Sequence, residues 1–350
     1  MGTITNMPEM NSRIFALLIG LNLSSSHALS GAEPPPRTSL SNARIRYTTP
    51  ELPYVVLKRG EIEAVVVDHR AVDDSVLPGH RAGYSGLASL KHSRQRRNLF
   101  VPSYAGLNFE HIIDGTTQER KVLFEPRNFP MQLRVVNDHV AELYQAPTPY
   151  YGVESCHRFE LRSDGAIEMT FECIPRRATW ANGYLLFFWA SYIDRPESLD
   201  IHFLGQTEGE TGAGRWIRGV TPKHGANATH RALLDHRDFP HTEPFPLELP
   251  FGFSGHRYSE PWYYGLCRGM ALAQFFRARD GVRLTQSPSG GGNGCPAWDF
   301  QWAIPQCRVD QRYQLVMRAA YTPWPLEPDD AHARQALSRH PGKLNKQPKP

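Results

Sequence analysis

The stretch YYGVESCHRFELRSDGAIEMTFEC, from Tyr150 to Cys173, decides the fold of this chain. Two runs in which polar and apolar residues alternate flank the pair Asp164-Gly165, which is typical of a tight turn between antiparallel strands. The run from Tyr184 to Ile193 follows and is almost wholly apolar, as in a strand that is buried on both faces. We therefore expect this region to form the centre of a large β-sheet.

The register of this hairpin decides which side chains meet. A two-residue turn at Asp164-Gly165 places Cys156 opposite Cys173 and His157 opposite Glu172. The two cysteines are then the pair that we nominate for a disulfide, with buried free thiols as the alternative. A three-residue turn would shift the pairing by one position and separate them onto opposite faces. The other cysteines, which have no Cys-x-x-Cys spacing, are Cys267, Cys295 and Cys307.

Strand-like runs recur along the rest of the chain without the repeat period of a propeller. The composition, with 29 Pro and 28 Gly in 350 residues, suits many short strands joined by turns. The polar stretches 68–101 and 205–245 are predicted as loops, and 330–337 as a short helix. We predict an all-β fold, one large antiparallel β-sandwich with long loops and a short C-terminal helix. The predicted strands outside the central region are 54–58, 62–67, 131–136, 139–144, 200–204, 262–267, 270–276, 282–286, 298–304 and 312–321.

The N-terminal region has the composition of a secretory signal peptide. Arg13 precedes a mostly apolar run, 14–23, and the small-residue stretch 24–32 follows. This run is too short to span a bilayer as a helix, which takes about 20 residues; a frayed apolar tail is the alternative. Translation could begin at Met7 or at Met10. We predict a secreted or periplasmic protein with a signal peptide at 1–32, a linker at 33–43, a single β-sandwich domain at 44–328, and a short helix with a basic tail at 329–350.

The charge of the chain is mild, with a formal net charge of +4 and dispersed basic residues. The one dense basic run, 91–97, belongs to no recognisable nucleic-acid-binding module and is predicted as a solvated loop. No other segment approaches the roughly 18 uninterrupted apolar residues of a membrane helix. We expect neither a nucleic-acid partner nor membrane contact after signal cleavage, and the sequence does not indicate an oligomeric state.

The first of three polar clusters contains Asn108, Glu110, His111, Glu125 and Arg127. A carboxylate, an imidazole and a guanidinium on neighbouring segments can supply a base, an acid and an anchor for a sugar hydroxyl or an anion. In a regular strand, however, Asn108 and Glu110 share one face while His111 points to the other. Glu110 and His111 can line one cleft only if the backbone turns between them. The alternative is a capped loop with one ion pair.

The second cluster, His157 with Glu172 and Glu168, lies on the central hairpin. Cross-strand neighbours lie about 5 Å apart at Cβ, which lets a carboxylate hold an imidazole and shift its pKa. Such a pair could act as an acid or a base, with His202 as a further candidate acid. The alternative is a polar face toward solvent or a buried structural pair.

The third cluster is aromatic. Alternation along 298–304 places Asp299 and Gln301 on one face of a strand and Trp298 with Trp302 on the other. Flat rings beside carboxylates and amides form a surface that suits sugars, whereas large aromatic residues more often fill a core. The candidate ligand-binding residues of all three clusters are Asn108, Glu125, Arg127, Trp189, Tyr192, Trp262, Tyr263, Trp298, Asp299 and Gln301.

Motifs for a metal site, a phosphate loop and a serine nucleophile are missing from the sequence. Ser287 and Ser289 lie in Ser-Pro-Ser-Gly-Gly-Gly, which is not the Gly-x-Ser-x-Gly elbow of serine hydrolases. The same glycines lack the lysine and the helix that follow in a phosphate-binding loop. No metal and no cofactor is predicted, because short ligand spacings are missing among the histidines considered, which are His111, His139, His157 and His202.

Five segments carry a resemblance to a known superfamily: GLNFEH (106–111), FEPR (124–127), WASYI (189–193), SPSGGG (287–292) and PAWDFQ (296–301). Over about 104–321 the chain resembles exported bacterial proteins of the galactose-mutarotase-like superfamily, with its aldose-epimerase-type supersandwich. That superfamily includes aldose epimerases, which use a histidine acid and a carboxylate base, and also sugar-binding and lyase domains. The epimerase motif Asn-His-x-Tyr-Phe-Asn is absent from this sequence, so its catalytic residues are not transferred.

We expect an exported carbohydrate-active protein that binds a sugar or polysaccharide in a cleft on the sandwich face. As an enzyme it would carry out acid/base chemistry at a sugar, of the epimerase, lyase or hydrolase type; a hydrolase needs two carboxylates about 5–10 Å apart. The alternative is a non-catalytic carbohydrate-binding or surface-interaction module. The candidate catalytic residues are His111 as acid, Glu110 or Glu172 as base, and His157 or His202 as reserve acids, with Arg127 as the anchor.

Overall fold

The computed structural model describes residues 37–117, 119–324, 334–335, 337–340 and 343–344. The predicted signal peptide at 1–32 lies outside these residues, as does the start of the predicted C-terminal helix at 329–333. The described part of that helix, 334–335 and 337–338, is helical. A helix with the length and apolar character needed to cross a membrane does not occur among the described residues.

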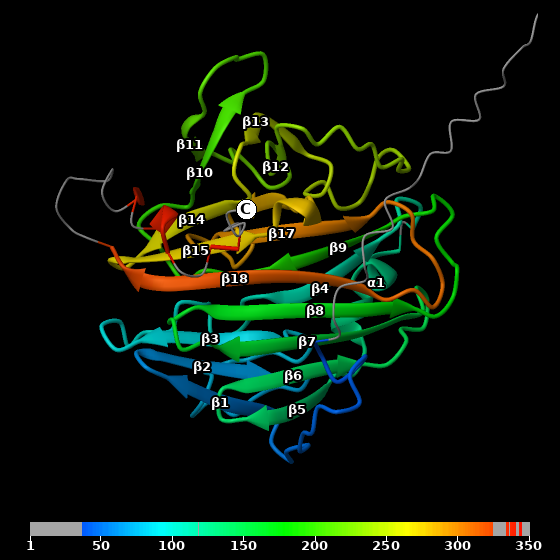
Figure 1. Cartoon of the computed structure of the whole chain (residues 1–350), viewed down its shortest axis with the longest axis vertical. Coiled ribbons are helices and arrows are strands. Elements are labelled where there is room, and N and C mark those ends of the chain that lie inside the picture. Colours follow the sequence, from blue (N-terminus) through cyan, green and yellow to red (C-terminus); the bar gives the residue numbers. More distant parts are fainter. Residues whose placement is uncertain (1–36, 118, 325–333, 336, 341–342, 345–350) are drawn as a thin grey trace, which may run out of the picture. The chain divides into compact units, whose positions relative to one another are not determined.

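Strands dominate the described chain and form two hydrogen-bonded sheets (Figure 1). One sheet has three strands in the order β1-β2-β3, and the other has fifteen in the order β4-β9-β17-β16-β12-β13-β10-β14-β15-β18-β8-β7-β6-β5, with β11 paired to β10. Apart from the parallel pair β12 and β13, the strand pairs of the described residues are antiparallel, which confirms the predicted fold class. The strands are β1 (Tyr54–Arg59), β2 (Ile62–Val67), β3 (Gly86–His92), β4 (Asn108–Ile113), β5 (Gln132–Asn137), β6 (Val140–Gln145), β7 (Val153–Leu161), β8 (Ile167–Pro175), β9 (Leu185–Ala190), β10 (Ile201–Thr207), β11 (Arg215–Gly219), β12 (Thr229–Ala232), β13 (Phe253–Tyr258), β14 (Trp262–Cys267), β15 (Met270–Phe276), β16 (Arg283–Ser287), β17 (Ala297–Ile304) and β18 (Tyr313–Pro323).

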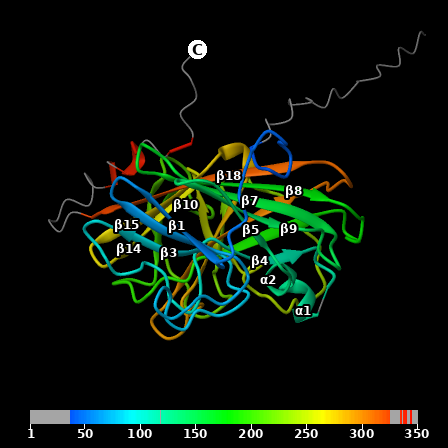
Figure 2. The ribbon, with the colours of Figure 1, turned by 90° about the horizontal axis from the view of Figure 1, so that it is seen from below.

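The long sheet folds back on itself, so that its two ends enclose the main hydrophobic core. This core joins residues of β4, β9 and β17 to residues of β7, β8 and β18, and β8 and β18 lie over β9 and β4 (Figure 2). Between them, the ring centroid of Phe171 lies 5.2 Å from that of Phe109 and 5.0 Å from that of Trp189. Sheets that pack face to face through such side chains form a β-sandwich.

The central hairpin forms as β7 and β8, but its predicted register is wrong by one position. The N–H of Arg162 donates to the carbonyl of Ala166 at 2.8 Å, which leaves a three-residue turn that ends in Gly165 at φ +81°. An Asp-Gly pair fits this turn as well, because glycine then supplies the left-handed residue.

The one-position shift separates the two cysteines that were nominated for a disulfide. Cys156 pairs with Glu172, and Cys173 pairs with Ser155, so the two thiols point to opposite faces of the sheet. His157 lies opposite Phe171 instead of Glu172. All five cysteines are free thiols in this structure.

The apolar run 184–193 forms β9, and every residue of this strand is buried. The strand lies inside the long sheet between β4 and β17, as expected for an apolar strand that is covered on both faces. Its Trp189 indole N–H donates to His157 Nε2 at 3.1 Å within the core.

Several short elements occur in stretches without a clear sequence pattern. The prediction of 68–101 and 205–245 as loops was wrong for β3, β11 and β12, and β13 was not predicted. The sequence of β12, Thr-His-Arg-Ala, shows no alternation of polar and apolar residues. This strand forms because it pairs with β13 and β16. The short helices α1 (Arg120–Leu123) and α2 (Glu125–Asn128) were also missed, and a 3-10 turn follows β15 at Ala278–Asp280.

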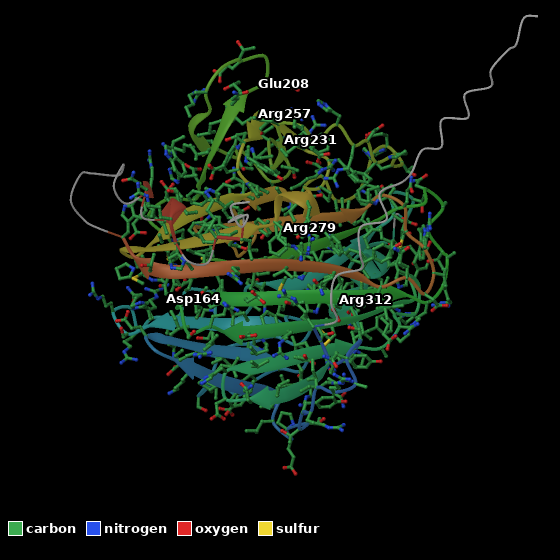
Figure 3. All side chains as sticks on the ribbon, viewed as in Figure 1. Asp164, Glu208, Arg231, Arg257, Arg279 and Arg312 are labelled. Atoms are coloured by element: carbon green, nitrogen blue, oxygen red, sulfur yellow. The ribbon has the colours of Figure 1, made fainter. Side chains whose placement is uncertain are left out.

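Residues 37–41, within the predicted linker, pack on the sheet around the buried Glu172 carboxylate of β8. The N–H and hydroxyl of Thr38 donate to this carboxylate at 3.3 and 2.8 Å. Arg312, which directly precedes β18, donates to it at 2.9 Å, at the opposite end of the sheet from Asp164 (Figure 3). Burial raises the pKa of Glu172, but hydrogen bonds, the largest of them from Ser41, outweigh burial and lower the pKa. Glu172 therefore anchors the start of the domain.

Glu172→Ala should lower the free energy of unfolding by about 3–5 kcal/mol, because it leaves Arg312 and the Thr38 donors buried without this acceptor. Glu160→Ala, at a partly exposed carboxylate of β7, is the matched control and should cost less than about 1 kcal/mol. Urea unfolding of both variants measures the difference.

The pKa of Glu172 is lowered in the folded protein. The contribution of Glu172 to the free energy of unfolding is therefore fully present above the usual pKa of about 4.3 and is lost as pH falls below that value. Equal losses in the two variants would contradict the anchoring role.

Candidate functional site

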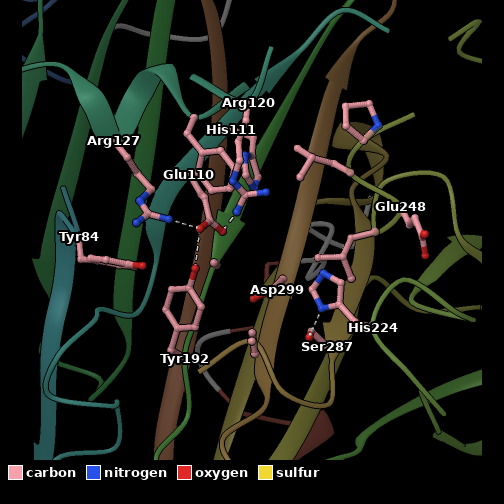
Figure 4. Close-up of a pocket in the computed structure, with 17 residues that line it drawn as sticks. Tyr84, Glu110, His111, Arg120, Arg127, Tyr192, His224, Glu248, Ser287 and Asp299 are labelled. Carbon is pink, nitrogen blue, oxygen red and sulfur yellow. Dashed lines mark hydrogen bonds and ion pairs between the residues drawn. The ribbon is translucent and has the colours of Figure 1, made fainter. Parts of the chain in front are cut away.

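A cavity of about 540 Å³ opens on the outer face of β4, β9 and β17, which are neighbours in the long sheet (Figure 4). The strands form its floor, and loops from distant parts of the sequence form its walls. The residues that line it are Tyr84, Glu110, His111, Arg120, Phe124, Arg127, Ala190, Tyr192, His224, Pro246, Leu247, Glu248, Leu249, Ser287, Gly290, Ala297 and Asp299.

A β-bulge in β4 brings Glu110 and His111 to the same wall. Phe109 pairs with Trp189 and His111 pairs with the adjacent Phe188, so Glu110 is an extra residue without a partner in the ladder. Phe109 points into the main core, whereas Glu110 and His111 both line the cavity. The bulge is the backbone turn that these two neighbours need in order to share one cleft.

The buried Glu110 carboxylate accepts hydrogen bonds from two side chains and lies close to a third. Arg127 Nη1 donates to Oε1 at 2.6 Å, and the Tyr192 hydroxyl donates to the same oxygen at 2.5 Å. The second oxygen, Oε2, lies 3.5 Å from His111 Nε2. Burial, reinforced by the charge of Glu110, raises the pKa of Tyr192, so this hydroxyl keeps its proton for the hydrogen bond. Charge-assisted bonds of this kind fix the orientation of a carboxylate and offset the cost of burying it.

The His111 imidazole is neutral at pH 7, because burial lowers its pKa to about 4 against the opposing effect of Glu110. Its Nδ1 lies 3.2 Å from the carbonyl oxygen of Leu123. A carbonyl only accepts, so the hydrogen is assigned to Nδ1, and Nε2 is left with a free lone pair. The ring is fixed between Phe124 and Phe188, at centroid distances of 4.1 and 5.3 Å. His111 thus presents a proton acceptor.

The pKa of Asp299 in β17 is raised, whereas that of His111 is lowered. Burial raises its pKa well above the usual range, and the charge of Glu110 raises it further. Its one opposing contact is the N–H of Ser191, which donates to Oδ1 at 2.9 Å. A carboxyl group in such surroundings favours its protonated form and can act as a proton donor near neutral pH.

Arg127 lies against aromatic rings at the edge of the cavity. Its guanidinium carbon lies 3.8 Å from the ring centroid of Tyr84 and 5.1 Å from that of Phe124. Gln145 of β6 donates to the carbonyl of Pro126 at 2.9 Å, which fixes the short helix α2 that carries Arg127. The rings give the wall an apolar surface, and the guanidinium gives it hydrogen-bond donors.

Two predicted residues of the first cluster lie beside the cavity without lining it. The Asn108 amide donates to the carbonyl of Ser85 at 2.7 Å. Glu125 accepts the N–H groups of Tyr150 and Tyr151 at 2.5 and 3.1 Å. Both side chains therefore hold backbone segments around the site. The predicted residues that the cavity does bring together are Glu110, His111, Arg127, Tyr192 and Asp299.

The predicted catalytic residues of the second cluster lie elsewhere. Glu172 holds residues 37–41, and His157 is enclosed in the main core, where burial lowers its pKa to about 3. His202 stacks on Tyr264 at a centroid distance of 5.0 Å. These side chains do not meet Glu110 in one site, so they have structural positions in this fold.

The aromatic residues of the third cluster are mostly core. The alternation predicted for β17 holds, since Trp298 belongs to the main core while Asp299 lines the cavity. The Gln301 amide donates to the hydroxyls of Thr229 and Thr285 at 3.0 and 2.9 Å. The predicted ligand-binding rings that are buried in hydrophobic clusters are Trp189, Trp262, Tyr263 and Trp298.

Sequence reasoning missed the residues that loops contribute to the cavity. Tyr84 and His224 lie in stretches predicted as loops, where nothing indicates which side chains approach the sheet. Phe124 lies in the segment FEPR, which was recognised as part of the resemblance, but it was given no role. The lining residues without a predicted role are Tyr84, Arg120, Phe124, Ala190, His224, Pro246, Leu247, Glu248, Leu249, Ser287, Gly290 and Ala297. Across the part of the chain that the structure describes, no three His, Cys, Asp or Glu side chains form a group that could hold a metal ion.

No protein-family model matches the sequence, and no curated protein matches it. Solved structures do match. A galactose mutarotase-like protein from Lactobacillus casei ATCC 334 is 7% identical, with 77% of this chain and 99% of that chain covered and a TM-score of 0.45. The Slr1438 protein from Synechocystis sp. PCC 6803 is 10% identical, with 80% and 99% covered and a TM-score of 0.44.

The heparan sulfate lyase HepC from Pedobacter heparinus is also similar, at 10% identity and a TM-score of 0.38, with 81% of this chain and 37% of that chain covered. At these TM-scores, the function has to be inferred from the side chains of this chain.

The imidazole of His111 should not titrate between pH 8 and pH 5.5, because its pKa is about 4 instead of 6.5. Nuclear magnetic resonance of histidine-labelled protein measures this, with the signal assigned by its loss in His111→Gln. Glu110→Gln should lower the pKa of His111 further, since the charge of Glu110 raises it.

Between pH 6.5 and pH 4 the unfolded chain binds a proton at His111 that the folded chain does not bind. The free energy of unfolding should therefore decrease as pH is lowered through this range, by up to about 1.4 kcal/mol per pH unit. Titration of His111 near 6.5 would contradict its buried, neutral state.

Proposed function

We propose that this protein binds a saccharide in the cavity and transfers protons to and from it. One observation carries the proposal: the cavity contains a buried carboxyl group whose pKa is raised and an imidazole whose pKa is lowered to about 4. The raised pKa favours the protonated form of Asp299, and the lowered pKa leaves His111 without a proton near neutral pH. A pair of groups whose pKa values are pushed apart in this way is the usual arrangement of a general acid and a general base.

The size and the lining of the cavity suit a sugar. Its volume of about 540 Å³ lies within the range of about 300–1,000 Å³ that is typical of small-molecule sites. Phe124 and Leu247 offer apolar surface to a sugar ring, while Arg120 and Glu248 offer hydrogen bonds to hydroxyl groups. A ligand with both an apolar face and many hydroxyls satisfies both kinds of side chain.

The roles of the floor residues follow from their protonation. Asp299 would donate its proton to an oxygen of the sugar, the ring oxygen or the oxygen of a substituent at the anomeric carbon. His111 Nε2 would accept a proton from a hydroxyl or a carbon of the same sugar. The Glu110 carboxylate, 3.5 Å from Nε2, would stabilise the imidazolium that this step creates. Arg127 and Tyr192 keep Glu110 in place and are positioning residues.

This assignment reverses one role given by the sequence, since His111 acts as the base and Asp299 as the acid. The reason is burial, which disfavours the charged form of each group. In the interconversion of anomers, His111 would take the proton of the anomeric hydroxyl while Asp299 gives its proton to the ring oxygen, and the bond between the anomeric carbon and the ring oxygen breaks. Closure of the ring on the other face of the anomeric carbon re-forms this bond and reverses both proton transfers, so that both residues return to their starting states. Export of the protein is a further part of the proposal and rests on the predicted signal peptide at 1–32.

Turnover should fall at least about a hundredfold in Asp299→Asn and in His111→Gln, which is the usual contribution of a general acid or base. Anomer exchange is followed by polarimetry on a panel of hexoses, pentoses and uronic acids, with sugar binding measured by calorimetry. The rate in the wild-type protein should rise as pH increases through about 4 and fall where Asp299 loses its proton. Asp238→Asn and His236→Gln, at exposed positions, are the matched controls and should leave turnover unchanged.

Saturable sugar binding without turnover of any sugar would overturn the enzymatic part of the proposal and leave a binding module. Release of reducing ends or of unsaturated products from polysaccharides would instead identify a hydrolase or a lyase. Retention of full turnover in both Asp299→Asn and His111→Gln would show that the acid and the base lie elsewhere.

A further inference from the structure

A second pair of reactive side chains lies in the same cavity, apart from Asp299 and His111. His224 Nδ1 lies 3.0 Å from the Ser287 hydroxyl oxygen, and both residues line the cavity (Figure 4). The N–H of Ser289 also donates to this oxygen at 3.4 Å. In the tautomer of His224 that carries its hydrogen on Nε2, the Ser287 hydroxyl donates to Nδ1. A serine within hydrogen-bond reach of a histidine is the minimal arrangement of an activated oxygen nucleophile.

The Ser287 side chain lines the cavity but is only 1% exposed, and the loop that follows it approaches closely. A Cβ at Gly290 would clash with the Cβ of Ala297 at 2.7 Å and would fill the space 3.5 Å from the Ser287 oxygen, so glycine leaves that space free. In the same loop, the N–H groups of Gly291 and Gly292 donate to the carbonyls of Cys295 and Ser289. The N–H of Gly290 donates to no residue that the structure describes. A free N–H beside a nucleophile is what stabilises the oxyanion of acyl transfer.

We propose that Ser287 and His224 form a catalytic dyad that hydrolyses an ester, and that its substrate is an acylated sugar. The dyad itself rests on the geometry of His224, Ser287 and Gly290, whereas the sugar part of the substrate rests on the proposed function above. The sequence motif for a serine nucleophile is missing because this serine ends β16 and is not on a strand-to-helix elbow.

The proposed ester hydrolysis needs no reagent other than water. The Ser287 oxygen attacks the ester carbonyl while its proton moves to His224 Nδ1, and the Gly290 N–H donates to the oxyanion. The carbon–oxygen bond to the sugar breaks, and the leaving sugar oxygen takes the proton from His224. Water then attacks the acyl-serine, with His224 accepting its proton and returning it to Ser287, which releases the acid.

A second serine–histidine contact in the chain provides a comparison. His230 Nδ1 lies 2.6 Å from the Ser254 hydroxyl, but His230 is fully buried and burial lowers its pKa to about 3. It does not line the cavity that holds His224 and Ser287. The same contact therefore occurs once away from the cavity and once at its wall, and reactivity should follow the cavity.

The full chain is treated with a fluorophosphonate probe and, separately, with pentaacetylglucose and with 4-nitrophenyl acetate. Mass spectrometry should find the probe on Ser287, and acetate should be released from the acetylated sugar. Ser287→Ala and His224→Gln should reduce labelling and acetate release at least about a hundredfold. Ser254→Ala, at the other serine–histidine contact, is the matched control and should stay within about twofold of the wild type in acetate release. Melting curves of all variants establish that each is folded.

Absence of labelling and of acetate release in the wild-type protein would overturn the dyad, as would labelling that persists in Ser287→Ala. Equal losses in Ser254→Ala would also overturn it, because they would show a structural effect. Cleavage of 4-nitrophenyl acetate with no release from pentaacetylglucose would overturn the sugar ester as substrate. The proposed proton-transfer function is tested by anomer exchange in Asp299→Asn, so the two proposals can fail independently.

Discussion

The hydrogen bond from the Arg127 guanidinium to the Glu110 carboxylate, at 2.6 Å, joins the short helix α2 to the floor of the cavity. A buried carboxylate without a partner would cost several kcal/mol, so this contact and the one from Tyr192 determine whether the floor can form. The bulge in β4 is what turns Glu110 toward these donors. The position of α2, the bulge and the orientation of Tyr192 thus depend on one another.

The charge of Glu110 also links the two titratable groups of the floor. It raises the pKa of His111 and that of Asp299. For His111 this opposes the effect of burial and keeps the lone pair of Nε2 basic enough to accept a proton. For Asp299 it adds to the effect of burial and favours the protonated acid. One carboxylate therefore makes the base stronger and keeps the acid protonated, which a neutral residue at position 110 would not do.

The sequence predicts those structural features that a local residue pattern determines. It does not predict the features that depend on contacts between distant segments. Alternation along β17 was enough to place Asp299 on the face opposite Trp298. The hairpin at Asp164-Gly165 was located, but its register was not, because an Asp-Gly pair fits turns of two and of three residues. A one-position shift moved Cys156 away from Cys173 and His157 away from Glu172. The bulge at Glu110 has no sequence signal, because a bulge is set by pairing with β9.

The division between strands and loops in the cavity has a consequence for its chemistry. Glu110, His111 and Asp299 stand on paired strands, which hold side chains more precisely than loops do. His224 and Glu248 come from loops that meet the sheet only through tertiary contacts. The three groups that the proposed proton transfer uses therefore all stand on strands. The proposed ester hydrolysis instead pairs Ser287, at the end of β16, with the loop residue His224, so the position of His224 relative to Ser287 depends on contacts that the sheet does not fix.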